Sequence, residues 1–485
     1  MGTDTGLMGD TGLPEEPTPY DRVEYPTAVF SQTHPERLAV LARLAGLDPV
    51  DPARSRILEI AGGDCMNLIA LAAAFPQCDA HGFDLSSVAI GRGQQTIAAA
   101  GLGNVTLVVE DILNARERYA ARSFDYVIAH GVYAWVPPEV REATMVLIGH
   151  VLSDRGVAFV SYNALPGGHF RMILRDMLLE VIGGIDDPAE KLSTARAFLE
   201  DYAKAQPGDE TIVCALREQA ESMLERPGAV LFHDELGDCF YPQTLRQVVS
   251  AGEAVGLRHL TDAGRIRHLD GFLAESDEGV DDPEAHVLRA AQLDDYLATR
   301  FFRQTALVRN EQIPDRRIDT SRIAGMMLTT KLRRLEDGRF ADGEEIVEIL
   351  DAELMESIAC VAEISPQRVP VSRIAQTPQQ LRAVLELFNR WHVNLHLAPA
   401  PFAAEPGDRP ETGRLIRAAL AQGDRMICSL DHGLMTIDQP ELRALLVAAD
   451  GSRTMAELSA LEHGIPGDEV PAALAAAARR ALLLR

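Results

Sequence analysis

The segment Arg56–Asn67, which reads R-I-L-E-I-A-G-G-D-C-M-N, constrains the fold more than any other part of the chain. An apolar strand that contains Glu59 leads into a turn with two glycines, and an apolar helix follows. Glycine permits backbone angles and close approaches that a side chain would block. A strand, a glycine turn and a helix in this order are typical of a Rossmann-like sheet, and they predict a ligand beside the turn.

The residues around the turn distinguish between the cofactors that such sheets bind. A dinucleotide site has the pattern G-x-G-x-x-G, so that a pyrophosphate rests on the helix N-terminus. The corresponding positions here are Ala61, Gly63 and Met66. S-adenosylmethionine (SAM) has no phosphate and tolerates the bulk of Met66, and Glu59 can face the ammonium of its methionine part. The turn therefore favours SAM over a nicotinamide cofactor.

Length and composition narrow the remaining classes. The 485 residues are enough for two or three domains, and a hydrophobic content of 47% with only 5% aromatics suits helices around a buried parallel sheet. The net charge of -26 argues against a nucleic-acid partner, because a polyanion would be repelled. The same charge is compatible with a lysine-rich partner, although an acidic surface that only keeps the protein soluble explains it more simply.

The cysteines and the N-terminus bear on the cellular location. The six cysteines are scattered without a C-x-x-C motif, which predicts neither a zinc site nor a disulfide framework, and so a reducing compartment. The N-terminus lacks a basic start followed by an apolar stretch, and no segment reaches the roughly 18 uninterrupted apolar residues of a membrane helix. We expect a cytoplasmic protein without membrane insertion.

Short apolar runs alternate with helical patterns through the first half of the chain. This alternation predicts parallel strands joined by right-handed crossovers, with helices on both faces. The expected strands are 56–60, 79–83, 105–109, 124–129 and 157–162, and the expected helices are 67–75, 87–99 and 139–152. Long helices without strands follow from about 170 to 230, and two strand-like pieces, 257–260 and 301–309, are expected to close the same sheet.

Three regions emerge from these patterns. Residues 1–18, rich in glycine, threonine, proline and acid, are expected to form a disordered tail. Residues 19–310 are predicted to be the SAM-binding α/β domain, with a helical insertion at about 170–255. Residues 311–485 read as a winged-helix-like α+β domain, with short strands around 332–339 and 393–397 and helices at 352–364 and 378–389.

Acidic residues end two of the predicted strands. Asp84 comes 21 positions after Gly63, where Rossmann-like folds place an acid that accepts hydrogen bonds from both ribose hydroxyls. Its alternative role is a helix N-cap, which Ser86 can fill instead. Asp111 and Ile112 follow the third strand, where an acid and a backbone amide can read the amino edge of an adenine.

The loop after the fourth strand, H-G-V-Y-A-W-V-P-P at 130–138, should lie at the carboxyl edge of the sheet, where ligands bind. Tyr133 and Trp135 are expected to be exposed there and could hold a cation; packing against the helical insertion is the equal alternative. His130 could act as a general base, but a hydrogen bond to the cofactor or backbone is favoured. Tyr162 and Asn163, after the fifth strand, could position a substrate.

Other reaction classes find little support in the sequence. His392 and His396 lie on an expected strand without an H-E-x-x-H pattern, so we expect no metal site. Neither a G-x-S-x-G elbow nor a G-x-x-x-x-G-K loop occurs, which removes common hydrolases and nucleotide hydrolases. Group transfer from SAM remains.

Several motifs in the same order resemble those of a known family. They are Tyr20-Asp21, Tyr25-Pro26, His34-Pro35, the 59–67 turn, G-F-D-L-S at 82–86, F-D-Y-V-I-A-H-G-V-Y-A-W-V-P at 124–137 and S-Y-N-A-L-P-G-G at 161–168. The chain resembles bacterial class I methyltransferases with a methyltransferase regulatory domain, the family that includes rickettsial protein-lysine methyltransferases acting on outer membrane proteins. The resemblance covers nearly the whole chain; it assigns about 230–263 to the regulatory domain and the tail to a winged-helix-like domain.

The resemblance implies a class I methyltransferase sheet and a lysine side chain of a protein as the acceptor. The predicted cofactor-binding residues are Tyr25, Glu59, Ala61, Gly62, Gly63, Asn67, Asp84, Leu85, Ser86, Asp111, Ile112, His130 and Gly131. The predicted acceptor-side, catalytic residues are Tyr133, Trp135, Tyr162 and Asn163. A homodimer is the expected assembly if the chain self-associates.

Two departures from the family keep alternatives open. The family usually has glycine at the positions of Ala61 and Cys65, and a side chain there costs roughly 1 to 2 kcal/mol if φ is positive. A SAM-binding regulator that transfers no methyl group is therefore one alternative. The others are a methyltransferase acting on a small-molecule amine or hydroxyl, and a nicotinamide oxidoreductase.

Overall fold

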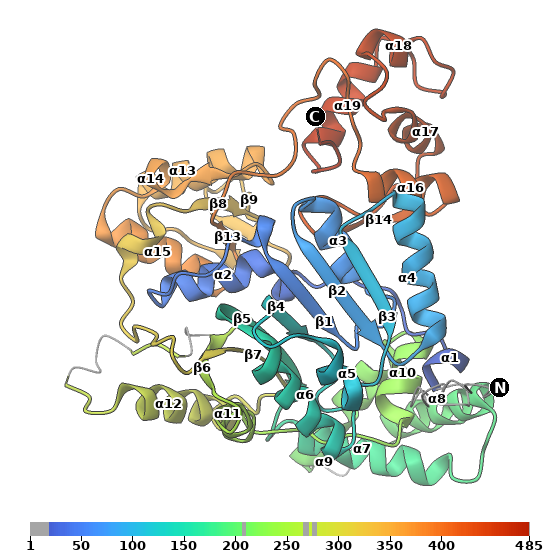
Figure 1. Cartoon of the computed structure of the whole chain (residues 1–485), viewed down its shortest axis with the longest axis vertical. Helices are drawn as coiled ribbons and strands as arrows, with labels where there is room; N and C mark the ends of the chain where they lie inside the picture. Colours follow the sequence, from blue (N-terminus) through green and yellow to red (C-terminus); the bar gives the residue numbers. More distant parts are fainter. Residues whose placement is uncertain (1–18, 206–209, 265–270, 274–278, 485) are drawn as a thin grey trace, which may run out of the picture.

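A computed structural model describes residues 19–205, 210–264, 271–273 and 279–484; the predicted tail at 1–18 lies outside the described residues. Its centre is a seven-stranded sheet in the order β3-β2-β1-β4-β5-β7-β6 (Figure 1). The strands are β1 (Arg56–Ile60), β2 (Asp79–Asp84), β3 (Val105–Val109), β4 (Phe124–Ala129), β5 (Leu152–Asn163), β6 (Leu257–Asp262) and β7 (Phe302–Arg309). The Rossmann-like sheet is confirmed.

The first five strands are parallel, whereas β7 runs antiparallel to both β5 and β6. The two closing strands therefore belong to the same sheet, as expected, but they make it mixed rather than wholly parallel. The antiparallel direction places the start of β7 beside the end of β5, where Asn163 pairs with Phe302. Both ends consequently meet at the carboxyl edge of the sheet.

Helices cover both faces of the sheet because its strands are apolar on both sides. Ile57 packs into one core with α2, α3 and α4, and its neighbour Leu58 packs into a second core with α5 and α6. These helices are α2 (Pro35–Leu44), α3 (Met66–Ala74), α4 (Ser87–Ala100), α5 (Ile112–Arg118) and α6 (Pro138–Val151). The bounds of α3, α4 and α6 match the expected helices to within one residue, whereas α5 was not expected.

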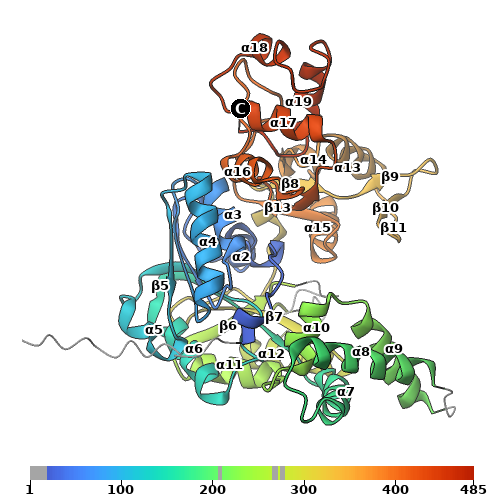
Figure 2. The same cartoon turned by 90° about the vertical axis from the view of Figure 1, so that its right-hand side faces the viewer.

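A helical insertion separates β5 from β6, as predicted. It contains α7 (Gly168–Val181), α8 (Pro188–Lys204), α9 (Thr211–Leu224) and α10 (Gly228–Leu236), and α11 (Leu245–Glu253) follows on the sheet. The insertion has its own apolar core, which includes Leu174, Leu199 and Met223. It projects from the lower part of the molecule (Figure 2). The last connection to β7 is α12 (Pro283–Leu297).

The C-terminal region mixes helices with small sheets. Its first part has β8 (Met327–Thr330) between β12 (Val369–Pro370) and β13 (Val393–His396), with α13 (Ala352–Ile364) and α15 (Pro378–Asn389). Its second part, with a separate core, has α16 (Arg414–Gln422), β14 (Met426–Cys428), β15 (Leu434–Thr436), α17 (Pro440–Ala448), α18 (Met455–Ser459) and α19 (Val470–Ala478). An α+β region is confirmed; its winged-helix character and the boundary near residue 310 stay predictions.

One expected strand in this region is shorter than predicted. Within 332–339 only Arg333–Arg334 is a strand, and residues 335–339 form a turn, because Leu335 and Arg339 close a hydrogen-bonded loop around Gly338, whose φ is +87°. The turn joins β9 (Arg333–Arg334) to β10 (Phe340–Asp342), which pairs in turn with β11 (Glu345–Val347).

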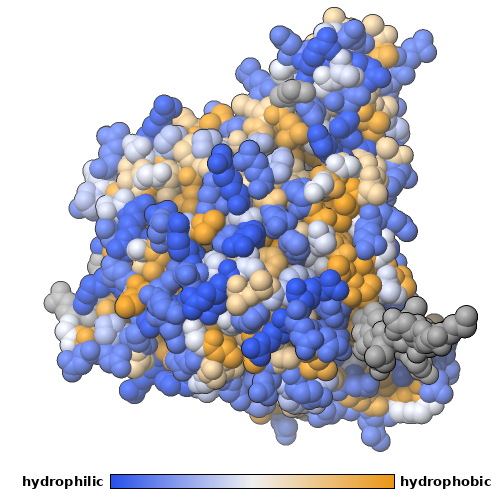
Figure 3. Space-filling view, viewed as in Figure 1, coloured by the Kyte–Doolittle hydropathy of each residue, from blue (hydrophilic) through white to orange (hydrophobic). Residues whose placement is uncertain are grey.

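The surface of the molecule is mostly polar. The face in Figure 3 is largely hydrophilic, with smaller hydrophobic areas between the polar side chains. Among the described residues, no helix combines the length and the apolar character needed to cross a membrane.

Candidate functional site

The turn between β1 and α3 has an unusual backbone. Ala61, Gly63 and Cys65 have φ of 52°, 61° and 54°, so three of five consecutive residues adopt the left-handed conformation. Only Gly63 adopts it without steric cost. The Sγ atom of buried Cys65 lies 2.8 Å from where a Cβ on Gly62 would stand, so the turn is also tightly packed. Both departures from the family pattern therefore fall on strained positions.

Asp84 ties this turn to the end of β2. Its Oδ2 accepts a hydrogen bond from the Gly63 amide at 2.8 Å, and its Oδ1 accepts one from the Ser86 amide at 2.8 Å. Ser86 is the N-cap of α4, since its hydroxyl accepts from Ala89 N. Burial raises the pKa of Asp84. A carboxylate has about four acceptor positions, so acceptor capacity remains on both oxygens.

Glu59 and Asn67 face each other across the turn. Asn67 Nδ2 donates to Glu59 Oε1 at 2.7 Å, whereas the buried Glu59 Oε2 has no hydrogen-bond partner. Burial raises the pKa of Glu59 to about 7, against the hydrogen bond from Asn67, which lowers it. A Cβ on Gly62 would lie 3.0 Å from Oε2, so this atom faces the turn. The orphaned oxygen can accept a hydrogen bond, and an ammonium is a group that could donate it.

The end of β3 also lies at this edge of the sheet. Asp111 is the N-cap of α5 and accepts a hydrogen bond from Leu113 N at 2.9 Å, and Ile112 is buried beside it. Leu85 and Tyr25 are more exposed, at 38% and 39%. The hydroxyl of Tyr25 donates to Asp234 Oδ1 at 3.4 Å, which links the N-terminal segment to the insertion.

His130 and Gly131 end β4 and are joined through Ser161 of β5. Gly131 N donates to Ser161 Oγ at 2.9 Å, and this hydroxyl lies 2.8 Å from His130 Nδ1. The hydroxyl of Ser161 accepts from the amide, and its contact with Nδ1 is a hydrogen bond whose direction is set by the tautomer of the His130 ring. Burial lowers the pKa of His130 to about 4, so the ring is neutral near pH 7. The Phe30 ring packs on it with centroids 4.0 Å apart.

The structure corrects the expectation that the aromatic side chains of the 130–138 loop are exposed. Tyr133 is 2% exposed, and Trp135 packs against Phe240 with centroids 4.8 Å apart. The cations over Trp135 are the protein's own Arg171 and Arg175, at 4.8 and 5.6 Å from the ring centroid. Packing against the helical insertion is thus the observed arrangement, because α7 and the 237–243 loop cover these rings.

The other two predicted acceptor-side residues are also buried. Tyr162 is 1% exposed and its hydroxyl lies 2.9 Å from Thr305 Oγ1 of β7; its contact with an acceptor stays a prediction. The closing strand β7 pairs with β5 along its edge at Tyr162 and Asn163. Asn163 is 6% exposed, and its Oδ1 is buried without a partner.

The N-terminal arm, residues 27–33, also contacts the site, although the sequence did not place it there. Phe30 N donates to Asn67 Oδ1 at 3.0 Å, the Thr33 hydroxyl bonds the same amide, and Thr27 bonds Asp64 of the turn. The only sequence signals are the two flanking motifs, Tyr25-Pro26 and His34-Pro35. The arm reaches the turn across more than thirty residues of chain, which local patterns do not report.

One further side chain comes from the far end of the chain. His432, in the turn between β14 and β15, places Nε2 at 2.9 Å from Asn67 Oδ1. These two residues are 365 positions apart. Nothing in the D-H-G sequence around His432 marks it as part of the site.

Comparisons with known proteins place this geometry in a family. A methyltransferase domain model matches residues 58–158, which span β1 to β5. The uncharacterized protein RP028 of Rickettsia prowazekii (strain Madrid E) is 33% identical over 220 residues, which are 45% of this chain and 87% of that protein. The chain belongs to the class I SAM-dependent methyltransferases. Its cofactor is accordingly SAM.

Two other relatives extend the likeness of this methyltransferase. The uncharacterized protein RP789 of the same organism is 28% identical over 322 residues, 65% of this chain but only 57% of that protein. The structure of PKMT2 from Rickettsia typhi has 22% identity and a TM-score of 0.79, covering 95% of this chain and 100% of that one. Its complex with AdoHcy gives a TM-score of 0.77. The methyltransferase therefore shares its fold with PKMT2, including the C-terminal region.

Proposed function

We propose that this methyltransferase transfers the methyl group of SAM to the side-chain amine of lysine in a protein substrate. A cavity of about 500 Å³ at the carboxyl edge of the sheet carries the proposal. It lies between the sheet and the C-terminal region and is lined by acidic, basic and aromatic side chains that include Asp262, Phe302, Lys331, Asp342 and Trp391. Mixed charge beside aromatic rings suits a polypeptide carrying an alkyl ammonium.

The residues around the glycine turn fit the cofactor. Glu59, with its orphaned Oε2, would take the ammonium of SAM, and Asp84, with acceptor capacity on both oxygens, would take the ribose hydroxyls. Asp111 and Ile112 would face the adenine. When bound, SAM supplies an electrophilic methyl group on a sulfonium.

The neighbouring side chains favour a neutral amine. Displacement at a methyl group needs an uncharged nucleophile held in line, and apolar rings beside the amine disfavour its ammonium form. The centroid of the buried His130 ring lies 4.0 Å from that of Phe30 and 6.3 Å from that of Phe302, which is 40% exposed. His130 is neutral and bonded to Ser161, so we assign it a positioning role rather than that of a base.

Incubation of the purified protein with methyl-labelled SAM and a cell lysate tests the acceptor. We expect label on protein lysines, identified by mass spectrometry, and none when Asp84→Ala replaces the wild type. Label only in the small-molecule fraction would overturn the lysine proposal in favour of a small acceptor. SAM binding without any label would favour the regulator that the strained Ala61 and Cys65 leave open.

The location and partners follow from the same proposal. All six cysteines are free, which supports a reducing, cytoplasmic setting. A lysine-rich protein partner agrees with the charge of -26, and a nucleic acid does not. Light scattering on the purified chain tests the proposed homodimer.

A further inference from the structure

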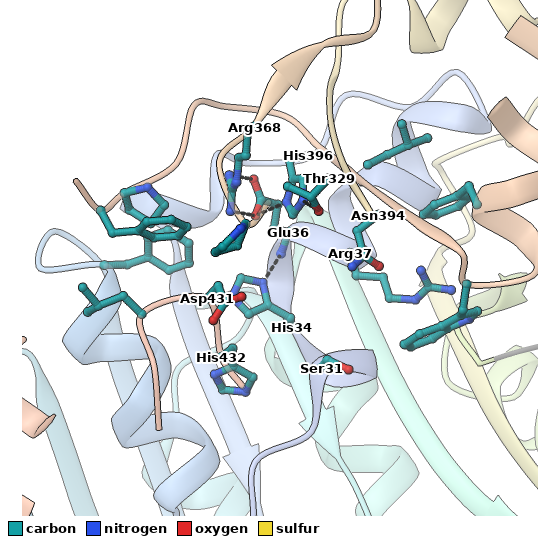
Figure 4. Close-up of a pocket in the computed structure, with 18 residues that line it drawn as sticks. Ser31, His34, Glu36, Arg37, Thr329, Arg368, Asn394, His396, Asp431 and His432 are labelled. Carbon is teal, nitrogen blue, oxygen red and sulfur yellow. Dashed lines mark hydrogen bonds and ion pairs between the residues drawn. The ribbon is translucent and has the colours of Figure 1, made fainter. Parts of the chain in front are cut away.

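His432 connects the C-terminal region to the cofactor side of the sheet. It sits in the turn between β14 and β15, is 5% exposed and has a φ of 64°. Figure 4 shows it on this C-terminal loop, beside His34; the two rings are 5.2 Å apart. A histidine held buried in a left-handed conformation requires surrounding contacts that maintain it.

The contacts of Asn67 determine which way its amide points. Phe30 N can only donate, so the Asn67 atom that it meets at 3.0 Å is the carbonyl Oδ1. The Nδ2 group consequently faces Glu59 Oε1, at 2.7 Å. His432 Nε2, at 2.9 Å from the same Oδ1, must then carry its hydrogen and donate.

The chain of hydrogen bonds ends at Glu59, on the carboxylate oxygen next to the orphaned one. Because Asn67 holds Oε1, the second oxygen of Glu59 is left buried, unpartnered and directed at the glycine turn. We propose that His432 is a positioning residue for the cofactor, which acts through Asn67 to keep Glu59 Oε2 facing the ammonium of SAM. This inference rests on the proposed role of Glu59, but it does not depend on the identity of the methyl acceptor.

The link acts in both directions, because coupling between two binding events is reciprocal. A cofactor that takes up Glu59 Oε2 stabilises the orientation of Asn67 that His432 requires. Binding therefore strengthens the contact of the 426–437 hairpin with α3. Removal of the His432 donor weakens cofactor binding by the same factor by which the cofactor strengthens the contact of the hairpin.

Two substitutions at position 432 separate the hydrogen bond from the backbone. His432→Asn tolerates a positive φ but is too short to reach Asn67, whereas His432→Gln can place an amide donor near the position of Nε2. S-adenosylhomocysteine contains the ammonium, and 5′-methylthioadenosine lacks the whole amino-acid part. Calorimetry with the full-length chain and these two ligands provides the readout.

We expect His432→Asn to bind S-adenosylhomocysteine about tenfold more weakly, the loss of one hydrogen bond, and to bind 5′-methylthioadenosine as the wild type does. His432→Gln should restore most of the affinity. His463→Asn is the matched control, because His463 is a buried histidine of the same C-terminal region that bonds Leu458 O and Ile465 N, both within that region. Hydrogen exchange of residues 426–437 should slow with S-adenosylhomocysteine in the wild type and less in His432→Asn.

Equal losses for both ligands would overturn the inference, because they would show a general structural role. Unchanged affinity for S-adenosylhomocysteine in His432→Asn would overturn it as well. Glu59→Gln separates these failures from a failure of the underlying assignment. If Glu59→Gln retains full preference for S-adenosylhomocysteine, the role of Glu59 at the ammonium is wrong, and the inference fails with it.

Discussion

Individual residues of the glycine turn carry opposing demands of stability and binding. In the folded state, the left-handed conformation of Ala61 costs about 1–2 kcal/mol relative to glycine. Glycine has more conformational freedom in the unfolded chain, which favours unfolding by about 0.4–1 kcal/mol and offsets part of the gain. We expect Ala61→Gly to raise the free energy of unfolding by about 0.5–1 kcal/mol. Urea unfolding measures it. Ala70→Gly, in the middle of α3, is the control and should destabilise; an equal loss at both positions would contradict the strain.

Protonation of Glu59 makes a second prediction at this scale. Burial raises its pKa to about 7, so the free protein carries a protonated Glu59 at pH 6 and a charged one at pH 9. An ammonium ligand requires the carboxylate. Binding of S-adenosylhomocysteine should therefore release up to about one proton at pH 6 and almost none at pH 9. Calorimetry in buffers of different ionisation enthalpy measures this release, which Glu59→Gln should abolish. Proton uptake at pH 6 would contradict it.

Among the secondary-structure elements, the helical insertion depends on one buried ion pair. Arg171 of α7 bonds both oxygens of Glu235 of α10, at 2.6 and 3.1 Å, and Glu235 is fully buried. Arg171→Met leaves that carboxylate with Arg226 alone, so we expect a loss of about 2–4 kcal/mol in the free energy of unfolding. Lys204→Met removes an exposed pair with Glu200 and should cost about 0.5 kcal/mol or less. Chemical unfolding that gives similar losses for both would refute this dependence.

Elements were predictable from the sequence where local pattern decides them. The bounds of β1, β3 and β4 follow from short apolar runs between turns, and α13 and α15 from helical periodicity. The antiparallel direction of β7 was not predictable, because the direction of a strand depends on the whole connection that precedes it. The turn at Gly338 was not predictable either, because the two-residue strand before it is too short to show a periodic pattern. Side-chain burial was the weakest expectation, because the insertion that covers Trp135 lies far along the chain.

Over the whole molecule, contacts between distant segments decide what the sequence could not. The cofactor turn and Asp84 follow from a motif of thirty residues, and their strand-end positions are where the structure has them. The Asn67 contacts with Phe30 and His432 join three separate regions, and no local pattern encodes them. The C-terminal region is therefore not simply appended, because it contacts Asn67, a predicted cofactor-binding residue.

Besides shared apolar contacts, Glu36 of α2 links this region to the sheet domain through buried polar bonds. Arg368 bonds both of its oxygens, at 2.7 and 2.9 Å, and His396 Nδ1 lies 3.2 Å away, as Figure 4 shows. Burial acts to raise the pKa of Glu36, but the hydrogen bond with His396 and the charge of Arg368 hold it at about 2. A depressed carboxyl pKa stabilises the folded state above the unfolded value of about 4.5, and that contribution is lost as the pH falls towards 2.

We accordingly expect Arg368→Met to loosen the C-terminal region from α2, at a cost of about 3 kcal/mol or more because an unpaired carboxylate stays buried. Small-angle scattering should show a larger radius of gyration for this variant at pH 7, and for the wild type only as the pH drops below about 4.5. Arg334→Met removes an exposed pair with Glu356 inside the C-terminal region and should change neither value. Arg368→Met could instead stay as compact as Arg334→Met and keep its affinity for S-adenosylhomocysteine. That result would show that the buried pair does not hold the two regions together. The hydrogen bond from His432 to Asn67 would then have to be sustained by the apolar contacts around α2.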